Sequence, residues 1–331
     1  MFNNVVIIGD GAMAGVCAIL LCEKGIAARM WGYDAGQLAQ MEAARENKKF
    51  LPGYQLPQTL VFEADDAKVF VGADLIITAV PCQFMRGVWT RLKKYVPAGV
   101  PIVSVAKGIE NKTLLRPTEI LADVLGKETI CAVLSGPTIA DELARKLPAT
   151  ALAVSADEQL AQKVQATFNI GWLRVYTNTD IIGVELAGAM KNVIAIAAGI
   201  IDGVGAGDNA KAALLSRGLT EISRLGIAMG ANEKTFAGLS GLGDLVTTCI
   251  SPRGRNRSFG EKVGRGQNIH DAQAQMQGVV EGIATCASVV ELAKKYGIEM
   301  PITDAVYQIL FGGKSVRDAI SDLMTRRLKA E

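Results

Sequence analysis

The chain of 331 residues is long enough for two domains, and its composition, half hydrophobic and 21% charged, favours a large buried core over disorder. The net charge is only +2 and no long Lys/Arg run occurs, which argues against nucleic acid as a main partner, because backbone binding needs a concentrated basic surface. The six scattered cysteines form no CxxC pair, so we expect buried, reduced side chains rather than disulfides or a zinc site.

The N-terminus and the histidine content narrow the classes further. The apolar residues 5–8 run directly into a Gly-rich turn, so they do not form a signal peptide, and no uninterrupted apolar stretch approaches a membrane-spanning length. His270 is the single histidine, which excludes a multi-His metal site, and we expect a loop or cap residue there rather than a catalytic group. The sequence predicts a soluble, cytoplasmic protein without a metal.

Short apolar runs alternate with helical patterns in the first half of the chain. Continuous apolar strands are typical of a parallel sheet covered by helices on both faces. We therefore expect residues 1–182 to form a Rossmann-type α/β domain with a doubly wound, mostly parallel sheet. The predicted strands are 5–8, 27–31, 75–80, 101–105, 129–134, 149–154 and 173–176, and predicted helices between them include 14–24 and 113–125.

The segment Gly9-Asp-Gly11-Ala-Met-Ala14 follows the first predicted strand and opens the first predicted helix. This G-x-G-x-x-A arrangement, in this context, predicts a dinucleotide site. Gly9 permits a tight turn, Gly11 lets the backbone approach a pyrophosphate, and Ala14 permits close helix–strand packing. The helix N-terminus offers free N–H groups and partial positive charge to the phosphates.

The second predicted strand leaves the choice between NAD and NADP open. An NAD-binding fold usually ends this strand with an acidic residue that binds the ribose hydroxyls. Here the strand ends Trp31-Gly-Tyr33, so Asp34 comes slightly late for that role, and no arginine follows that could bind a 2′-phosphate.

Two further segments, Ala106-Lys107-Gly-Ile-Glu and Leu134-Ser-Gly136-Pro-Thr138, also follow predicted strands. The carboxyl ends of parallel strands line the ligand crevice of an open α/β sheet. Lys107 could therefore reach a phosphate, and Gly136 could admit close approach of the backbone.

From about residue 182 the pattern changes to long helical stretches separated by Gly-rich turns. The predicted helices are 184–201, 209–226, 233–237 and 280–296, with a last helical segment from 303 onward. No strand candidate of similar strength occurs, so residues 183–331 are expected to form an all-helical domain that completes the active site.

Lys191 lies in the middle of a helix that is apolar on nearly all sides, and such a helix is normally buried. Burial should lower the pKa of this lysine and fit it for proton exchange near neutral pH. The alternative is a lysine whose ammonium extends to the domain surface.

Downstream, Asp244 lies between Gly-rich turns, and Arg255-Asn256-Arg follows. This cluster could bind a small phosphorylated or carboxylated substrate, since arginine holds such anions through two parallel hydrogen bonds. A solvated basic loop is the alternative.

Together these segments resemble the bacterial NAD(P)-dependent glycerol-3-phosphate dehydrogenases. The match comprises the Gly-rich turn, Lys107-Gly-Ile-Glu, Leu134-Ser-Gly-Pro-Thr, Met190-Lys-Asn-Val-Ile-Ala-Ile-Ala-Ala-Gly, Gly241-Leu-Gly-Asp-Leu, Arg255-Asn-Arg and Val279-Val-Glu-Gly. The motifs occur in the family's order from Gly9 to Gly282, and the blocks around Lys191 and at 241–245 are the specific ones.

The resemblance implies reduction of dihydroxyacetone phosphate to sn-glycerol 3-phosphate for phospholipid synthesis, with NAD or NADP as cofactor. It implies a catalytic role for Lys191 in proton transfer, supported by Lys107 and Asp244. It implies substrate contacts from Lys107, Gly136, Thr138, Asp244, Arg255 and Asn256. It implies cofactor contacts from Gly9, Gly11, Ala12, Met13, Ala14, Tyr33, Lys107, Ala140, Arg255, Val279 and Glu281. A homodimer is compatible with it.

Three features depart from the family pattern. Ala12-Met13-Ala14 replaces a Ser-aromatic-Gly sequence, so a hydroxyl and an aromatic surface near the cofactor are lost. Tyr33 stands where a basic residue is frequent, and Gly254 stands where a serine precedes Arg255. None of these removes the proton donor or the phosphate ligand that the resemblance implies.

Two rival functions stay open. A β-hydroxyacid or ketopantoate-type reductase combines the same architecture with a lysine but acts on a carboxylate. A non-catalytic dinucleotide sensor would bind the cofactor without turnover, although it would need neither Lys191 nor Arg255.

Overall fold

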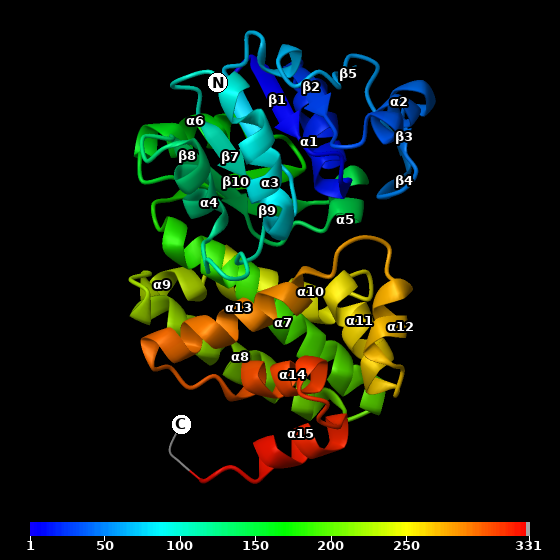
Figure 1. The fold of residues 1–331 in the computed structure, drawn as a ribbon, viewed down its shortest axis with the longest axis vertical. Helices are drawn as coiled ribbons and strands as arrows, with labels where there is room; N and C mark the ends of the chain where they lie inside the picture. Colours follow the sequence, from blue (N-terminus) through cyan, green and yellow to red (C-terminus); the bar gives the residue numbers. More distant parts are fainter. Residues whose placement is uncertain (329–331) are drawn as a thin grey trace. The chain divides into compact units, whose positions relative to one another are not determined.

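The structure, a computed structural model, describes residues 1–328 and divides into two compact units (Figure 1). Unit 1 comprises Met1–Lys107 and Leu115–Glu185, and unit 2 comprises Gly108–Leu114 and the chain from Leu186 onward. The division falls within the long helix α7 (Ile181–Val204). Unit 1 is α/β and unit 2 is helical, which confirms the predicted fold class.

An eight-stranded sheet forms the centre of unit 1, in the order β10-β9-β8-β7-β6-β1-β2-β5. Every neighbouring pair is parallel except β8 and β9, which are antiparallel. All seven predicted strands are confirmed, and the short β5 is additional. The strands are β1 (Asn4–Ile8), β2 (Ala27–Trp31), β5 (Val61–Phe62), β6 (Leu75–Thr78), β7 (Ile102–Ser104), β8 (Cys131–Ser135), β9 (Ala149–Val154) and β10 (Leu173–Asn178).

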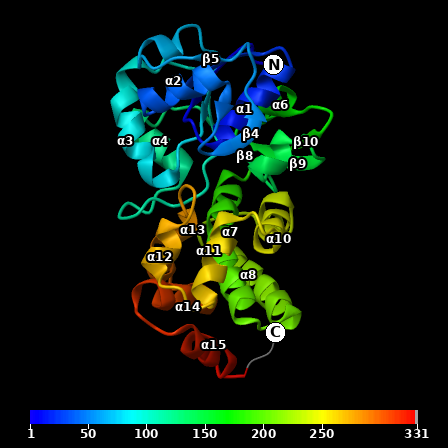
Figure 2. The same cartoon turned by 90° about the vertical axis from the view of Figure 1, so that its right-hand side faces the viewer.

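Helices cover both faces of this sheet (Figure 2). In β1, Val5 and Ile7 contribute to one apolar cluster, together with residues of α1 (Ala12–Glu23) and α6 (Glu158–Phe168). The alternate residues Val6 and Ile8 contribute to a second cluster with α3 (Cys82–Leu92) and α4 (Pro117–Leu125). Side chains alternate between the faces of a strand, so a strand covered on both faces is apolar throughout.

The remaining elements of unit 1 are short. They are α2 (Ala35–Ala44), β3 (Glu46–Asn47), β4 (Leu51–Gln55), the 3₁₀ turns η1 (Lys68–Phe70) and η2 (Lys93–Tyr95), and α5 (Ala140–Ala144). The strands β3 and β4 form a separate antiparallel pair.

The predicted helix at 113–125 starts four residues too early, because α4 begins at Pro117. Its first two residues, 113 and 114, belong to the segment Gly108–Leu114 of unit 2 instead. There, Ser288 Oγ donates to Ile109 O at 3.1 Å and to Asn111 Oδ1 at 2.6 Å. Leu114 has a φ of 61°, which a helix does not allow.

Unit 2 contains no strand within its described residues, as predicted. Besides most of α7, it contains α8 (Asp208–Ala228), α9 (Glu233–Phe236), a π-helical turn η3 (Leu239–Gly243), α10 (Asp244–Ile250), α11 (Arg255–Gly264), α12 (Ile269–Ala274), α13 (Glu281–Tyr296), α14 (Pro301–Phe311) and α15 (Val316–Met324). By length and mean hydropathy (1.6), α7 could cross a membrane. However, 89% of its 18-residue apolar stretch is buried inside the protein, as in a core helix.

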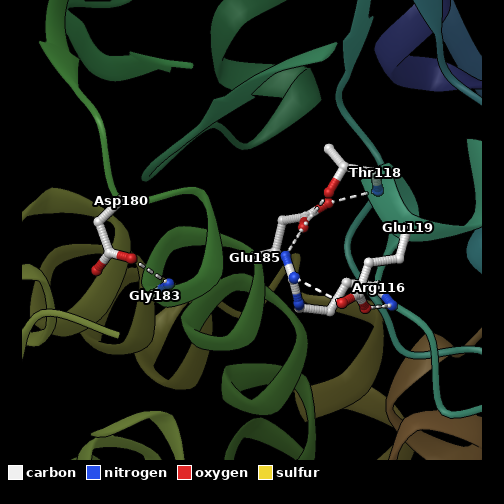
Figure 3. A network of polar contacts seen from close by, with 6 residues as sticks. All are labelled: Arg116, Thr118, Glu119, Asp180, Gly183 and Glu185. Carbon is white, nitrogen blue, oxygen red and sulfur yellow. Dashed lines mark hydrogen bonds and ion pairs between the residues drawn. The ribbon is translucent and has the colours of Figure 1, made fainter. Parts of the chain in front are cut away.

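Arg116 and Glu185 form a buried ion pair in unit 1 (Figure 3). Arg116 Nη1 lies 2.5 Å from Glu185 Oε2, with side chains 9% and 0% exposed. Thr118 donates to the same carboxylate through N (2.8 Å) and Oγ1 (2.7 Å). Burial raises the pKa of Glu185, and Arg116 and Thr118 oppose that rise. The first turn of α7 is thereby fixed to the start of α4.

We expect Glu185→Ala to lower the free energy of unfolding of unit 1 by about 3–5 kcal/mol, because it leaves Arg116 buried without its main partner. The matched control is Asp123→Ala, which breaks an exposed pair with Arg86 of similar length (2.6 Å) and should lower it by at most about 1 kcal/mol. Tryptophan fluorescence during urea unfolding reports on this unit, since Trp31, Trp89 and Trp172 all lie in it. Equal losses in the two variants would contradict the prediction.

In unit 2, Glu221 of α8 caps the start of α14. Its carboxylate is buried and accepts hydrogen bonds from Ile302 N (2.6 Å), Thr303 N (3.2 Å) and Thr303 Oγ1 (3.1 Å). Burial raises the pKa of Glu221 from 4.5 to about 7; the three hydrogen bonds lower it, and Asp304 adds to the rise.

A carboxyl group whose pKa is higher in the folded state stabilises the fold at low pH, and this contribution is lost as the pH rises through about 7. We expect the wild type to lose about 3 kcal/mol relative to Glu221→Gln between about pH 4.5 and about pH 7.5. Urea unfolding at several pH values measures this. A constant difference between the two proteins across this range would show that Glu221 does not titrate as described.

Candidate active site

The glycine-rich turn of unit 1 has the geometry of a pyrophosphate cradle. Gly9 has a φ of +123°, and a Cβ placed on it would lie 2.7 Å from Ala79 O, so only glycine fits. A Cβ on Gly11 would meet no atom within 4 Å in the described chain, which leaves that side of the turn open. The residues present therefore fit a dinucleotide.

Helix α1 begins at this turn, and no side chain occupies its first N–H groups. Gly11 is its N-cap, no side chain caps it, and its first turn holds no acidic residue. Its first N–H groups and the helix dipole can therefore act on a bound phosphate. Ala14 is fully buried, while Ala12 and Met13 are half-buried and pack against the apolar cluster.

At the end of β2, Tyr33 is 68% exposed and Asp34 has a structural role. The carboxylate of Asp34 is the N-cap of α2 and accepts hydrogen bonds from Gly36 N (2.8 Å) and Gln37 N (3.1 Å). Its late position in the sequence is explained by this cap.

Lys107, Gly136 and Thr138 lie together beyond the ends of β7 and β8. Lys107 Nζ donates to Gly136 O at 3.0 Å, and Thr138 Oγ1 donates to the same oxygen at 3.0 Å. Gly136 has a φ of +130°, a conformation that favours glycine. Ala140 begins the short helix α5 that follows.

In unit 2, Lys191 lies on α7 and is 6% exposed, so the prediction that this helix is buried is confirmed. Its Nζ lies 2.5 Å from Asp244 Oδ1 and donates to Thr248 Oγ1 at 2.6 Å. The carboxylate of Asp244, itself 1% exposed, stabilises the ammonium of Lys191. It thereby opposes the effect of desolvation, which favours the neutral amine. A buried ammonium with a fixed orientation can deliver a proton to a developing alkoxide.

Thr248 was not predicted as a site residue. It follows Asp244 by one helical turn on α10, and side chains four residues apart on a helix are neighbours, so its spacing from Asp244 was the signal in the sequence. The backbone before Asp244 is tightly packed, since a Cβ on Gly241 would lie 2.0 Å from Phe236 O.

The start of α11 carries the two predicted anion ligands. Arg255 is its first residue, is exposed, and forms no hydrogen bond or ion pair within residues 1–328. Asn256 is buried, its Nδ2 donates to Asn192 Oδ1 at 2.9 Å, and its Oδ1 accepts from Gly282 N at 2.9 Å. Because Asn192 follows Lys191 directly, these contacts bring the start of α11 to the lysine's own turn of α7.

Glycines let α11 approach α7 at backbone distance. A Cβ on Gly199 would lie 1.9 Å from Arg257 O, and one on Gly260 would lie 2.0 Å from Ile196 O. Gly203 and Gly264, one turn further along each helix, also lie against the opposite backbone, with a Cβ 2.4 Å from Glu261 O and from Ile200 O, respectively. The sequence signal was a G-x-x-x-G spacing in each helix, the pattern that lets two helices pack closely.

The predicted residues Val279 and Glu281 lie at the start of α13. Val279 is half-buried, and Glu281 is the first residue of this helix. The next residue, Gly282, touches the α7–α11 pair, since a Cβ there would lie 2.7 Å from Asn192 O and 2.8 Å from Asn256 Oδ1.

The structure also places the single histidine and the six cysteines. No three His, Cys, Asp or Glu side chains gather in residues 1–328 to hold a metal. The side chain of His270 is 92% exposed, and the backbone N–H of His270 donates to Oδ1 of the N-cap Asn268 (2.8 Å), so it is a cap-region residue as expected. No disulfide joins any of the six cysteines, and four of them are buried.

Comparison with known proteins finds similarity along the chain. The family described as NAD-dependent glycerol-3-phosphate dehydrogenase matches with its N-terminus over residues 4–161 and with its C-terminus over residues 180–321. The glycerol-3-phosphate dehydrogenase (NAD(P)+) of Citrifermentans bemidjiense is 45% identical over 100% of this chain and 99% of its own length. That of Chlorobium limicola is also 45% identical, over 99% of each chain.

Solved structures are also similar to this chain. Glycerol-3-phosphate dehydrogenase from Coxiella burnetii has a TM-score of 0.94 and 37% identity, covering 98% of this chain and 99% of its own. A ketopantoate reductase from Ralstonia eutropha has a TM-score of 0.62 and 15% identity, over 97% of this chain and 99% of its own, which shows a shared fold alone.

Proposed function

The chain belongs to the NAD-dependent glycerol-3-phosphate dehydrogenase family, and on that basis we propose that it reduces dihydroxyacetone phosphate to sn-glycerol 3-phosphate with NADH or NADPH. The observation that carries the proposal is Lys191, buried with its ammonium 2.5 Å from Asp244. A ketone reduction needs such a proton donor. The product would serve as a backbone for phospholipids.

We assign dinucleotide binding to residues 1–182 and substrate binding with catalysis mainly to residues 183–331. The turn from Gly9 to Ala14 would hold the pyrophosphate through backbone N–H groups and the dipole of α1. Further cofactor contacts are proposed for Tyr33, Lys107, Ala140, Arg255, Val279 and Glu281. The bound nicotinamide supplies the hydride.

The substrate phosphate would bind at the start of α11. Arg255 makes no contact that competes for its guanidinium within residues 1–328, and a guanidinium matches a phosphate with two parallel hydrogen bonds. The side chain of Asn256 already bonds to Asn192 and Gly282, so we assign its phosphate contact to its backbone N–H, which the helix leaves unpaired. Lys107, Gly136 and Thr138 are proposed as additional substrate contacts.

Lys191 would transfer its proton to the C2 oxygen as negative charge develops there. Asp244 and Thr248 hold its Nζ in one orientation, so little reorganisation is needed at the moment of transfer. Lys107 would add positive charge near the developing alkoxide. Asp244 then favours return of a proton to the neutral amine, because a buried carboxylate without a cation is unfavourable.

A cytoplasmic location is part of the proposal, and the six cysteines support it, since none forms a disulfide and a reducing compartment keeps thiols reduced. Nucleic acid is not an expected partner at a net charge of +2. A homodimer is proposed from the family resemblance alone.

Purified protein mixed with dihydroxyacetone phosphate and either NADH or NADPH should show rapid loss of nicotinamide absorbance. Ketopantoate, which carries a carboxylate in place of a phosphate, serves as the rival substrate and should give little loss. Oxidation with ketopantoate alone would move the chain to the reductase alternative. Cofactor binding without oxidation of either mixture would favour a sensor.

The variant Lys191→Gln should lower kcat by about 10²–10⁴-fold, because it removes the transferable proton while keeping an N–H donor for Asp244. Cofactor affinity should stay unchanged, and this also shows that the variant is folded. Lys234→Ala removes an exposed lysine of the same unit and is the control. Turnover within a few-fold of wild type in Lys191→Gln would disprove the assigned role.

A further inference from the structure

The side chain of Asp10, in the glycine-rich turn, places a carboxylate beside the end of β2. Gly9 N donates to Trp31 O at 2.9 Å, which holds the turn against the end of β2. The next residue, Asp10, directs its carboxylate to Gly32, where a Cβ would lie 3.1 Å from Oδ2 and 3.3 Å from the Asp10 Cβ. This is the end of the strand at which NAD-binding folds place their ribose-binding acid.

The carboxylate of Asp10 is available as an acceptor. Apart from its own backbone N–H, no hydrogen-bond donor within residues 1–328 reaches it. Burial raises the pKa of Asp10 and the charge of Asp34 adds to the rise, whereas Lys49 opposes it. Hydroxyl donors would therefore relieve a half-buried carboxylate that the protein itself leaves largely unsatisfied.

The nearby arginine is already neutralised. The guanidinium of Arg91 lies over the rings of Trp31 (5.1 Å) and Tyr33 (5.4 Å). It donates two hydrogen bonds to Asp66, from Nε at 2.7 Å and from Nη2 at 2.8 Å. A 2′-phosphate at this place would need a cation: Arg91 would have to abandon Asp66, and Lys49 already stabilises the Asp10 carboxylate, so neither is uncommitted.

We propose that Asp10 determines cofactor choice: it accepts hydrogen bonds from the adenosine ribose hydroxyls of NADH and repels the 2′-phosphate of NADPH. The inference rests on the proposed function, because it presumes that the glycine-rich turn holds a dinucleotide. A 2′-phosphate would replace a hydroxyl donor by an acceptor and bring negative charge to a carboxylate, so both effects act in the same direction.

Binding measured without substrate tests this separately from catalysis. Titrations of the full chain with NADH and with NADPH, followed by nicotinamide fluorescence, should give a Kd for NADH at least about tenfold lower than that for NADPH. Asp10→Asn keeps the size of the side chain and removes its charge. It should raise the Kd for NADH by about 10–100-fold and shrink the difference between the cofactors. Glu42→Gln removes an equal charge from the exposed face of α2 and should change neither Kd.

Each outcome is decisive. Equal or tighter binding of NADPH by the wild type would overturn the inference, and this result needs no variant. A wild-type preference for NADH that Asp10→Asn leaves intact would assign the choice to another residue. If neither cofactor bound, the proposed function would fail as well, whereas turnover with NADPH as the preferred cofactor would remove only the role of Asp10.

Discussion

Three charged side chains on one apolar helix must each find a partner, and much of the structure around α7 follows from that requirement. Glu185 is paired with Arg116 in unit 1, and Lys191 is paired with Asp244 in unit 2. Near the end of the helix, Asp202 is bridged by Lys211 and Arg257. An unpaired charge at such positions would be strongly destabilising, so each pair fixes an element against α7: α4, α10, and α8 with α11.

The second constraint is steric. Because glycines at 199, 203, 260 and 264 remove the side chains between α7 and α11, their backbones come into contact, and Asn256 reaches Asn192 directly. The first turn of α11, where Arg255 lies, is thus located by packing rather than by a flexible loop. The phosphate site that we propose on this turn would need little ordering when a ligand binds, which favours both affinity and correct placement of the reacting carbon.

The sequence revealed those features whose signals are local. The turn at Gly9 was recognisable because a strand precedes it and a helix follows it, and Lys191 stood out as a charge within an apolar helix. The partner of Arg116 was not predictable, since Glu185 lies 69 residues further along the chain. The same holds for the pairing of Asn192 with Asn256, whose side chains would have suited many other hydrogen bonds. Helix starts were missed where tertiary contacts override a local pattern, as before Pro117.

The seven residues Gly108–Leu114 have a consequence for how this protein can be divided. They interrupt unit 1 in sequence yet belong to unit 2, where Ser288 donates to Ile109 O and to Asn111 Oδ1. A gene truncated to encode the chain from Leu186 onward would therefore produce a helical fragment that lacks this segment, with the Ser288 hydroxyl deprived of its acceptors. Recombination that exchanged the helical half between relatives would have to carry this segment along. A single crossover near Leu186 therefore cannot transfer the whole of unit 2.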